Sequence, residues 1–203
     1  LDRVDNIDLE FKEKGLYLIT GGLGGLGLEL AKSLSQDKEL IFVMINRSSM
    51  PDREKWDSIL ESQQNEKMIK RIRGIREIEE SGSKVVSYAG DIANLSDMED
   101  IFEDIRANYG QINGLIHAAG LGSEGLLADT GLEDFSKVLA PKVMGTWVLE
   151  EVTKGDELDF FIMFSSINGL FGGPGQGSYA AANLYMDSFA AFRELKGEEA
   201  HSI

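Results

Sequence analysis

Residues 16–30 read LYLITGGLGGLGLEL, an apolar run followed by a glycine-rich loop and a stretch spaced with leucines. The run 16–20 is apolar on both faces, as in a strand that is buried between two layers of helices. Leu26, Leu30 and Leu34 recur four positions apart and predict a helix over residues 24–36. A buried strand, a glycine turn and a helix in this order are typical of a dinucleotide-binding unit.

The spacing of the glycines supports this interpretation. Gly22, Gly24 and Gly27 fit GxGxxG, and residues 20–27 also fit TGxxxGxG. Glycines allow a tight turn and let a pyrophosphate approach the backbone N–H groups at the helix N-terminus. A glycine turn that serves only close packing is the alternative. The place of the loop between a buried strand and a helix favours the nucleotide.

The rest of the chain continues to alternate strands with helices. Apolar runs predict strands over residues 39–46, 84–89, 114–118 and 158–165, with a sixth strand beginning at Ser202. Helices are predicted over residues 95–109, 132–152 and 179–196, with an irregularity at Pro141. This alternation predicts an α/β fold, a doubly wound parallel sheet (Rossmann-like) with helices on both faces.

Residues 51–80 form a long polar segment, and residues 51–70 are a candidate insertion. Within this segment four isoleucines recur every third position and predict a buried stripe on a solvated helix. The isoleucines are Ile69, Ile72, Ile75 and Ile78.

Composition excludes several classes of function. The chain has 203 residues and a net charge of −15, which disfavours nucleic acids and anionic membrane surfaces as partners. It has no cysteine and two histidines, so we expect no disulfide, no thiolate nucleophile and no metal site. The N-terminal residues lack an apolar signal core, and no apolar run reaches membrane-spanning length. We expect a cytoplasmic protein.

The residues that follow the predicted strands distinguish the cofactors. An acidic side chain after the second strand would bind a ribose 2′-hydroxyl, but this chain has Arg47 and Ser48 there. A guanidinium and a hydroxyl suit a 2′-phosphate, so the sequence predicts NADP rather than NAD. Asp91, after the third strand, suits the adenine amino group, although a helix cap would look similar. The small residues 118–120 let a cofactor lie against the backbone.

Residues 164–183 read FSSINGLFGGPGQGSYAAAN and carry the candidate reactive groups. Ser166 precedes Tyr179 by thirteen positions, and Asn183 follows Tyr179 by four. In a helix, Tyr179 and Asn183 would therefore share one face. A serine hydroxyl beside a tyrosine hydroxyl can polarise a carbonyl group and donate a proton to it.

Together these motifs make the chain similar to the catalytic half of a ketoreductase domain from a modular polyketide synthase, in the short-chain dehydrogenase/reductase superfamily. The resemblance is carried by YLITGGLGGLG (17–27), NRSS (46–49), HAAG (117–120), APKVMGTW (140–147) and residues 164–187. Typical short-chain dehydrogenases have lysine four positions after the tyrosine, where this chain has Asn183. Polyketide ketoreductases exchange the two residues, and Lys142, twenty-four positions before Ser166, matches their arrangement.

The resemblance implies reduction of a β-ketoacyl thioester to the β-hydroxyacyl thioester by NADPH during polyketide chain elongation. The implied partners are an acyl carrier protein, whose phosphopantetheine arm carries the substrate, and a structural half-domain of the same megasynthase. Tyr179 would donate the proton, and Ser166 would donate a hydrogen bond to the same oxygen; Ser165 is its rival, and the thirteen-residue offset favours Ser166. Lys142 would hold the nicotinamide ribose and supply positive charge, and Asn183 would hold a proton-relaying water. The implied cofactor-binding residues are Thr20, Gly21, Gly22, Leu23, Gly24, Gly25, Leu26, Gly27, Arg47, Ser48, Asp91, Ile92, Ala118, Ala119, Gly120, Lys142 and Tyr179.

The resemblance also divides the chain. Residues 1–14 are predicted to be a linker from a preceding region, and residues 15–203 the NADP-binding catalytic domain. This domain would lack the last strand and the substrate-covering region of the family. Glu124 occupies a position linked to alcohol configuration and favours the class that carries an acidic motif there. His117 is predicted to be a structural rather than a catalytic histidine.

Two other functions remain open at this point. The first is a free-standing short-chain dehydrogenase/reductase that acts on a small ketone or alcohol, which Asn183 in place of lysine disfavours. The second is a folded spacer that binds nucleotide without turnover, which the intact Ser166, Tyr179 and Lys142 disfavour.

Overall fold

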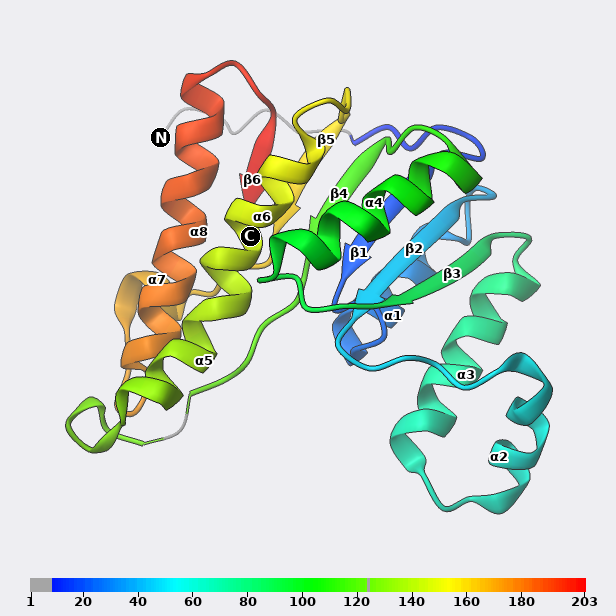
Figure 1. Ribbon diagram of the computed structural model, residues 1–203, viewed down its shortest axis with the longest axis horizontal. Coiled ribbons are helices and arrows are strands. Elements are labelled where there is room, and N and C mark those ends of the chain that lie inside the picture. The colour runs from blue at the N-terminus through cyan, green and yellow to red at the C-terminus, as the bar shows by residue number, and fades with distance from the viewer. Residues whose placement is uncertain (1–8, 124) are drawn as a thin grey trace.

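A single parallel sheet organises the molecule. The computed structural model describes residues 9–123 and 125–203, in which six strands pair in the order β3-β2-β1-β4-β5-β6. All five pairings are parallel, and the strand arrows in Figure 1 point toward one edge of the sheet. The strands are β1 Leu16–Thr20, β2 Ile41–Asn46, β3 Lys84–Ala89, β4 Gly114–His117, β5 Phe160–Met163 and β6 Ala200–Ser202. The predicted doubly wound parallel sheet is confirmed.

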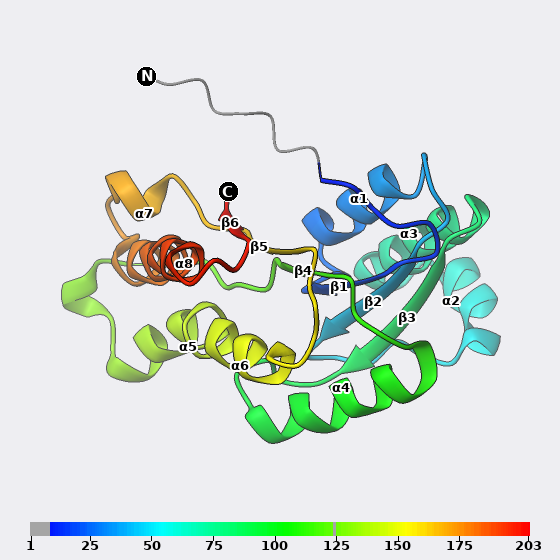
Figure 2. The same cartoon turned by 90° about the horizontal axis from the view of Figure 1, so that it is seen from above.

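Helices cover both faces of this sheet. Seen from above in Figure 2, α1 and α3 lie on one face, and α4, α5 and α6 lie on the other. The helices are α1 Gly25–Leu34, α2 Trp56–Ser62, α3 Glu66–Glu80, α4 Leu95–Tyr109, α5 Leu132–Lys142, α6 Met144–Thr153, α7 Asn168–Phe171 and α8 Gly177–Leu195, with 3-10 helices η1 Arg53–Lys55 and η2 Leu127–Asp129. The short η1 and α2 follow β2 within the candidate insertion.

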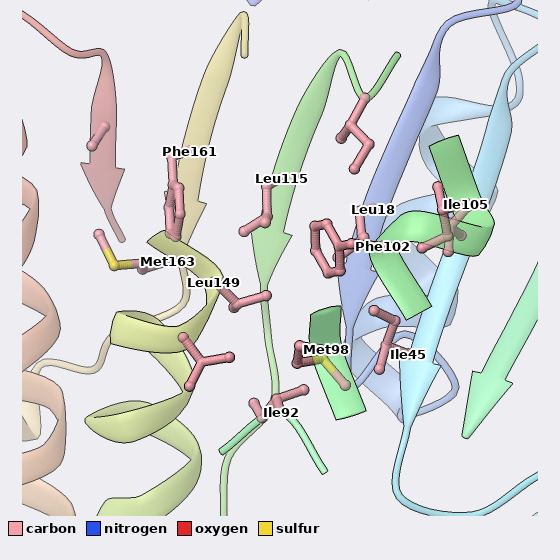
Figure 3. Packing of buried hydrophobic residues seen from close by; sticks show 14 of the residues in the cluster. Leu18, Ile45, Ile92, Met98, Phe102, Ile105, Leu115, Leu149, Phe161 and Met163 are labelled. Carbon is pink, nitrogen blue, oxygen red and sulfur yellow. The ribbon is translucent and has the colours of Figure 1, made fainter. Parts of the chain in front are cut away.

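Two apolar cores lie on the two faces of the sheet. On β1, Leu16 and Leu18 enter one core while Tyr17 and Ile19 enter the other, because successive side chains of a strand point to opposite faces. Figure 3 shows the first core, in which side chains of the strands pack against α4 and α6. The second core receives Ile72, Ile75 and Ile78 of the predicted stripe on α3, and Ile69 is also buried.

The predicted helix over residues 132–152 is wrong in one respect, because it is two helices. Helix α5 ends at Lys142 and α6 begins at Met144, with Val143 between them at φ −89° and ψ −65°. Pro141 lies inside the last turn of α5 and has no N–H to donate to the carbonyl of Lys137. The irregularity predicted at Pro141 therefore becomes a full break of the helix.

Other differences concern the ends of elements. Strand β5 is shorter than residues 158–165, and β6 begins at Ala200 rather than at Ser202. The short α7 and η2 were not predicted, because one helical turn is too short for a recognisable period.

Residues 9–14 pack against the sheet rather than extending away from it. Phe11 lies 4.7 Å from Tyr17 between ring centroids, and Lys12 forms an ion pair of 2.7 Å with Asp159. The backbone N–H of Lys12 also donates to the Tyr17 hydroxyl at 2.6 Å. Within the predicted linker 1–14, residues 1–8 lie outside the described residues, and the linker assignment stays a prediction.

Candidate active site

The order of the strands creates a crevice at the edge where the strands end. Strands β1 and β4 lie side by side, and Thr20 at the end of β1 pairs with Ile45 on one side and His117 on the other. The connections from β1 and β4 leave toward opposite sides of the sheet, and ligands bind at such a switch point. A cavity of about 580 Å³ lies here.

Nine of the predicted cofactor-binding residues line this cavity. They are Gly21, Gly24, Arg47, Ser48, Asp91, Ile92, Ala118, Ala119 and Gly120. Among them Asp91 also accepts the N–H of Ala93 at 3.0 Å, so its carboxylate stabilises the turn before α4, although Asn94 is the helix cap.

Close packing explains two of the glycines in the loop. Gly21 has φ +67°, and a Cβ there would lie 2.9 Å from the backbone of Ala119. A Cβ on Gly27 would lie 2.6 Å from the Cα of Gly22, so α1 can approach the loop only with glycine at position 27. Both backbone polar groups of Leu23 are hydrogen-bonded. Its N–H donates to Asn46 Oδ1, and its carbonyl accepts from Arg71 Nε at 3.1 Å.

Cations surround the larger cavity although the chain is acidic. Arg47, Lys67, Arg71 and Lys137 line it, while Asp91 is the single acidic residue in that lining. Arg71 is 8% exposed and also donates from Nη1 to the Ser48 hydroxyl at 3.2 Å. Sequence reasoning identified Arg47 but missed the two cations of α3 and Lys137.

The α3 cations could have been suspected from their spacing. Lys67 and Arg71 are four positions apart and therefore lie on one helix face. Gly74 allows α3 to lie close to α1, because a Cβ at that position would lie 3.1 Å from Leu28 of α1. This close approach of α3 to α1 brings Arg71 to the glycine loop.

A smaller cavity of about 280 Å³ shares lining residues with the first, namely Ala118, Gly120 and Leu121. It is lined by Leu26 and Gln176, by Lys142 and Tyr179 of the candidate reactive group, and by the rival serine, Ser165, whereas Ser166 is not in its lining. The predicted Leu26, Lys142 and Tyr179 therefore lie beside the end of the larger cavity, where a ligand that spans both would place its reactive end.

Lys142 is the best-defined group of this smaller cavity. It is 4% exposed, and its Nζ donates to the carbonyl of Phe164 at 2.5 Å and contacts Met186 Sδ at 3.5 Å. Burial lowers the pKa of Lys142 from 10.5 to about 8, and the charge of Asp187 opposes this shift. The lysine is therefore close to neutrality at moderately alkaline pH.

Tyr179 and Asn183 lie one turn apart at the beginning of α8. The Tyr179 ring centroid is 5.9 Å from Lys142 Nζ. Asn183 is fully buried, and its Nδ2 donates to the Tyr179 carbonyl at 2.7 Å. Its Oδ1 is buried without a hydrogen-bond partner among the described residues, which leaves one acceptor available beside the catalytic candidates.

The structure separates the two candidate serines. Ser165 lines the smaller cavity, and its hydroxyl donates to the Asn183 carbonyl at 3.3 Å. The Ser166 hydroxyl oxygen accepts the N–H of Asn168 at 3.2 Å. Within the described residues no acceptor takes the Ser166 hydroxyl proton, so this proton can be donated to a substrate oxygen. The assignment of the role to Ser166 stays a prediction.

Three further observations concern membrane spans, metal ions and Glu124. No helix in the described part of the chain is long and apolar enough to span a membrane, and no group of three acidic or histidine side chains there could hold a metal ion. Glu124, the residue connected with alcohol configuration, lies outside the described residues.

Comparison with known proteins identifies the family. The model of the KR domain matches residues 15–203. The chain belongs to the KR domain family. Within the short-chain dehydrogenase/reductase superfamily it is a ketoreductase domain of the polyketide synthase type, an oxidoreductase that acts on a carbonyl group.

Curated relatives of this KR domain are large synthases. A 6-methylsalicylic acid synthase of Arthrobotrys oligospora is 38% identical over 187 residues, which are 91% of this chain and 10% of the synthase. Polyketide synthase PksN of Bacillus subtilis is 36% identical over 184 residues, which are 90% of this chain and 3% of the synthase. The chain thus spans a tenth or less of these relatives.

Solved structures show the same fold. A crystal structure of an N-terminal ketoreductase from the macrolactin assembly line superposes with a TM-score of 0.82 at 30% identity, covering 95% of this chain and 37% of the other. A ketoreductase domain from the bacillaene assembly line superposes with a TM-score of 0.79 at 34% identity, covering 90% of this chain and 40% of the other.

Proposed function

We propose that this KR domain uses NADPH to reduce a β-ketoacyl thioester, presented on an acyl carrier protein, to the β-hydroxyacyl thioester. The observation that carries the proposal is that two cavities share lining residues, with cations around one and Lys142 and Tyr179 in the other. A dinucleotide lying across the switch point would have its phosphates at the first cavity and its reactive ring at the second.

The residues of the larger cavity fit a dinucleotide. The glycine loop brings backbone N–H groups at the N-terminus of α1 to the cavity, with Gly24 in its lining. The absence of side chains at Gly21 and Gly27 is a steric requirement there. Ala119 and Gly120, after β4, also line the cavity, and their small size leaves room for a ligand against the backbone.

The charge pattern favours the phosphorylated form of the cofactor. Strand β2 is followed by Arg47 and Ser48, and Arg71 lies against the Ser48 hydroxyl. Because Ser48 accepts from Arg71, its own proton remains available for a phosphate oxygen. Two guanidinium groups and a hydroxyl donor suit the negative charge and the acceptor oxygens of a 2′-phosphate. A neutral ribose 2′-hydroxyl would form an ion pair with neither guanidinium.

The chain's own residues supply the proton and hold the substrate oxygen. When bound, NADPH supplies the hydride. Tyr179 donates its hydroxyl proton to the oxygen of the substrate carbonyl, and Ser166 donates a hydrogen bond to the same oxygen. Lys142, buried and positively charged below pH about 8, holds the ribose and stabilises negative charge near Tyr179. Asn183 Oδ1, which has no hydrogen-bond partner among the described residues, accepts a hydrogen bond from a water that relays protons to Tyr179.

Exposed apolar side chains beside α8 suit an acyl chain. Leu127 is 58% exposed, and a Cβ on Gly177, two residues before Tyr179, would lie 3.5 Å from its Cδ1. Leu170 and Phe171 of α7 are both 77% exposed. The size of the curated relatives and their names support a substrate that is carried by a multidomain synthase.

The test measures oxidation of the reduced nicotinamide by the full chain, with a β-ketoacyl thioester either on an acyl carrier protein or as a short free thioester. We expect turnover with NADPH, weaker turnover with NADH, and a lower KM for the carrier-bound substrate. Turnover of small ketones alone, with no response to thioesters, would instead support a free-standing dehydrogenase.

The cofactor preference has its own variants. Arg71→Met is expected to weaken binding of 2′,5′-ADP about ten- to hundredfold while leaving 5′-AMP unchanged, because it removes a charged hydrogen-bond donor. Arg73→Met on the exposed side of α3 is the matched control. An equal loss for both nucleotides would mean that Arg71 only supports the glycine loop.

A further inference from the structure

The break between α5 and α6 lies directly at Lys142. Carbonyl groups in the last turn of a helix have no partner within that helix, and Pro141 and Lys142 both belong to this turn. A buried carbonyl without a hydrogen-bond donor is destabilising, so these two carbonyls need donors from outside α5. The fold provides them from two different elements.

Two fully buried side chains donate to these carbonyls. His117, the last residue of β4, places its Nε2 3.0 Å from the Pro141 carbonyl. Thr146, in the first turn of α6, donates its hydroxyl to the Lys142 carbonyl at 2.5 Å. The peptide units on both sides of the Lys142 Cα are therefore bound to residues that line neither of the two cavities.

The hydrogen bonds of His117 have a fixed direction. The Pro141 carbonyl can only accept, so Nε2 carries the proton and Nδ1 accepts from the Thr20 hydroxyl at 2.6 Å. The Thr20 oxygen in turn accepts the N–H of Ala119 at 3.3 Å. Burial lowers the pKa of His117 to about 3, with a further contribution from the charge of Lys142, so the ring stays neutral. Both ring nitrogens of His117 are thus hydrogen-bonded, and its structural role stays a prediction.

The side chain of Lys142 has little freedom to compensate for a shift of its backbone. A Cβ on Gly120 would lie 2.8 Å from its Cε, so the stem passes close to the strand end. Its Nζ is bound to Phe164 and Met186 on the far side. A displacement of the backbone at Lys142 is thus passed on to the ammonium group.

We propose that His117 and Thr146 are positioning residues, which hold the backbone of Lys142 at the α5–α6 break and thereby place its ammonium beside Tyr179. The inference rests on the proposed function of Lys142. The motif residues His117 and Thr146 are explained by this role, since each donates to one of the two carbonyls that the break leaves without helical partners.

The titratable groups that face Lys142 are few. His117 of β4 is neutral, and Tyr179 and Asp187 belong to α8. Because burial is the main cause of the lowered pKa of Lys142, a loosened backbone that lets water reach Nζ should return this pKa toward 10.5.

The test uses variants of the full chain that each change one side chain. Thr146→Val removes the donor to Lys142 with nearly unchanged volume, and Thr146→Ser restores it. Thr153→Val is the matched control, because Thr153 is also buried on α6 and its hydroxyl donates to the Leu149 carbonyl at 2.7 Å, away from the break. His117→Gln adds a second variant that keeps a side-chain donor.

Two readouts are taken together. The first is kcat on a β-ketoacyl thioester; Thr146→Val should lose about ten- to hundredfold at nearly constant KM, as expected for a misplaced catalytic group. The second is the titration of the lysine ε-carbon by NMR, with the Lys142 signal assigned by its loss in Lys142→Ala. Its midpoint should move upward in Thr146→Val and stay in Thr146→Ser and Thr153→Val.

The outcomes separate this inference from the proposed function. If Lys142→Ala is fully active, the role of Lys142 is wrong and the inference falls with it. If Lys142→Ala is inactive but Thr146→Val matches Thr153→Val in rate and in the Lys142 titration, the proposed function stands and the positioning role is overturned.

Discussion

The ammonium of Lys142 lies 5.9 Å from the centre of the Tyr179 ring, and these residues come from two different helices, α5 and α8. The distance depends on three local features: the break after Lys142, the beginning of α8 at Gly177, and the carbonyl of Phe164 to which the ammonium is bound. A buried cation at this position can stabilise negative charge that develops near the phenol of Tyr179.

The pH dependence of the rate should report the charge of Lys142. Burial lowers its pKa from 10.5 to about 8, and Lys142 acts as a cation, so its contribution is complete well below pH 8, is halved near pH 8 and is lost as the pH rises further. We expect kcat to fall through this range. Lys142→Arg should be slower but should lose this alkaline limb, because a guanidinium does not titrate there. The same limb in both proteins would assign it to another group.

The glycine loop should tolerate a methyl group at one position and reject it at another. Gly27→Ala places a Cβ 2.6 Å from the Gly22 Cα, and we expect a loss of about 1–3 kcal/mol of unfolding free energy together with weaker NADPH binding. Gly25→Ala meets nothing within 4 Å, and its stability should stay equal or rise by up to about 1 kcal/mol. Urea unfolding compares the two; equal losses would contradict the packing explanation.

The two serines should differ in their effect on the rate. Ser166→Ala removes the hydroxyl whose proton remains available, and kcat should fall about 10²–10³-fold, as when an oxyanion donor is lost. Ser165→Ala removes a hydrogen bond to the Asn183 carbonyl, and the loss should stay below about tenfold. Steady-state rates with one thioester decide between them, and the reverse order would move the role to Ser165.

A buried ion pair joins α6 to α8 and should contribute to stability. Arg193 is bound to Glu150, and both residues are less than 10% exposed. Arg193→Met should cost about 3 kcal/mol, since it leaves a buried carboxylate that, among the cations of the described residues, only Lys196 at 3.8 Å still approaches. The double variant Glu150→Leu/Arg193→Met should recover most of this loss in denaturant unfolding. A double variant as unstable as the single one would mean that packing of Arg193 on Phe161 dominates.

The order of the elements was predictable because each carries its own strong pattern. The run 16–20 and the glycines after it predict β1, the loop and α1 without reference to the rest of the chain. The cavity that these elements form could also be anticipated, since parallel strands end at one edge of a sheet.

Features that depend on contacts between distant elements were not predictable. The helix ends after Lys142 because Pro141 has no N–H for the Lys137 carbonyl, and the Pro141 carbonyl accepts instead from His117 of the distant strand β4. The Lys142 carbonyl accepts from Thr146, which lies only four residues further along the chain. Arg71 looked like one charge of a solvated helix. Its burial follows from the approach of α3 to α1 at Gly74, which no local pattern reveals.

The central claim is that Tyr179 donates a proton to the substrate carbonyl. The most direct measurement compares formation of the β-hydroxyacyl thioester by the full chain and by Tyr179→Phe, with NADPH and the same β-ketoacyl thioester. The variant should still be stabilised by NADPH in thermal unfolding, and its rate should fall about 10²–10⁴-fold or more, because a general acid is missing. A Tyr179→Phe protein that forms product at the rate of the unmodified chain would contradict the account.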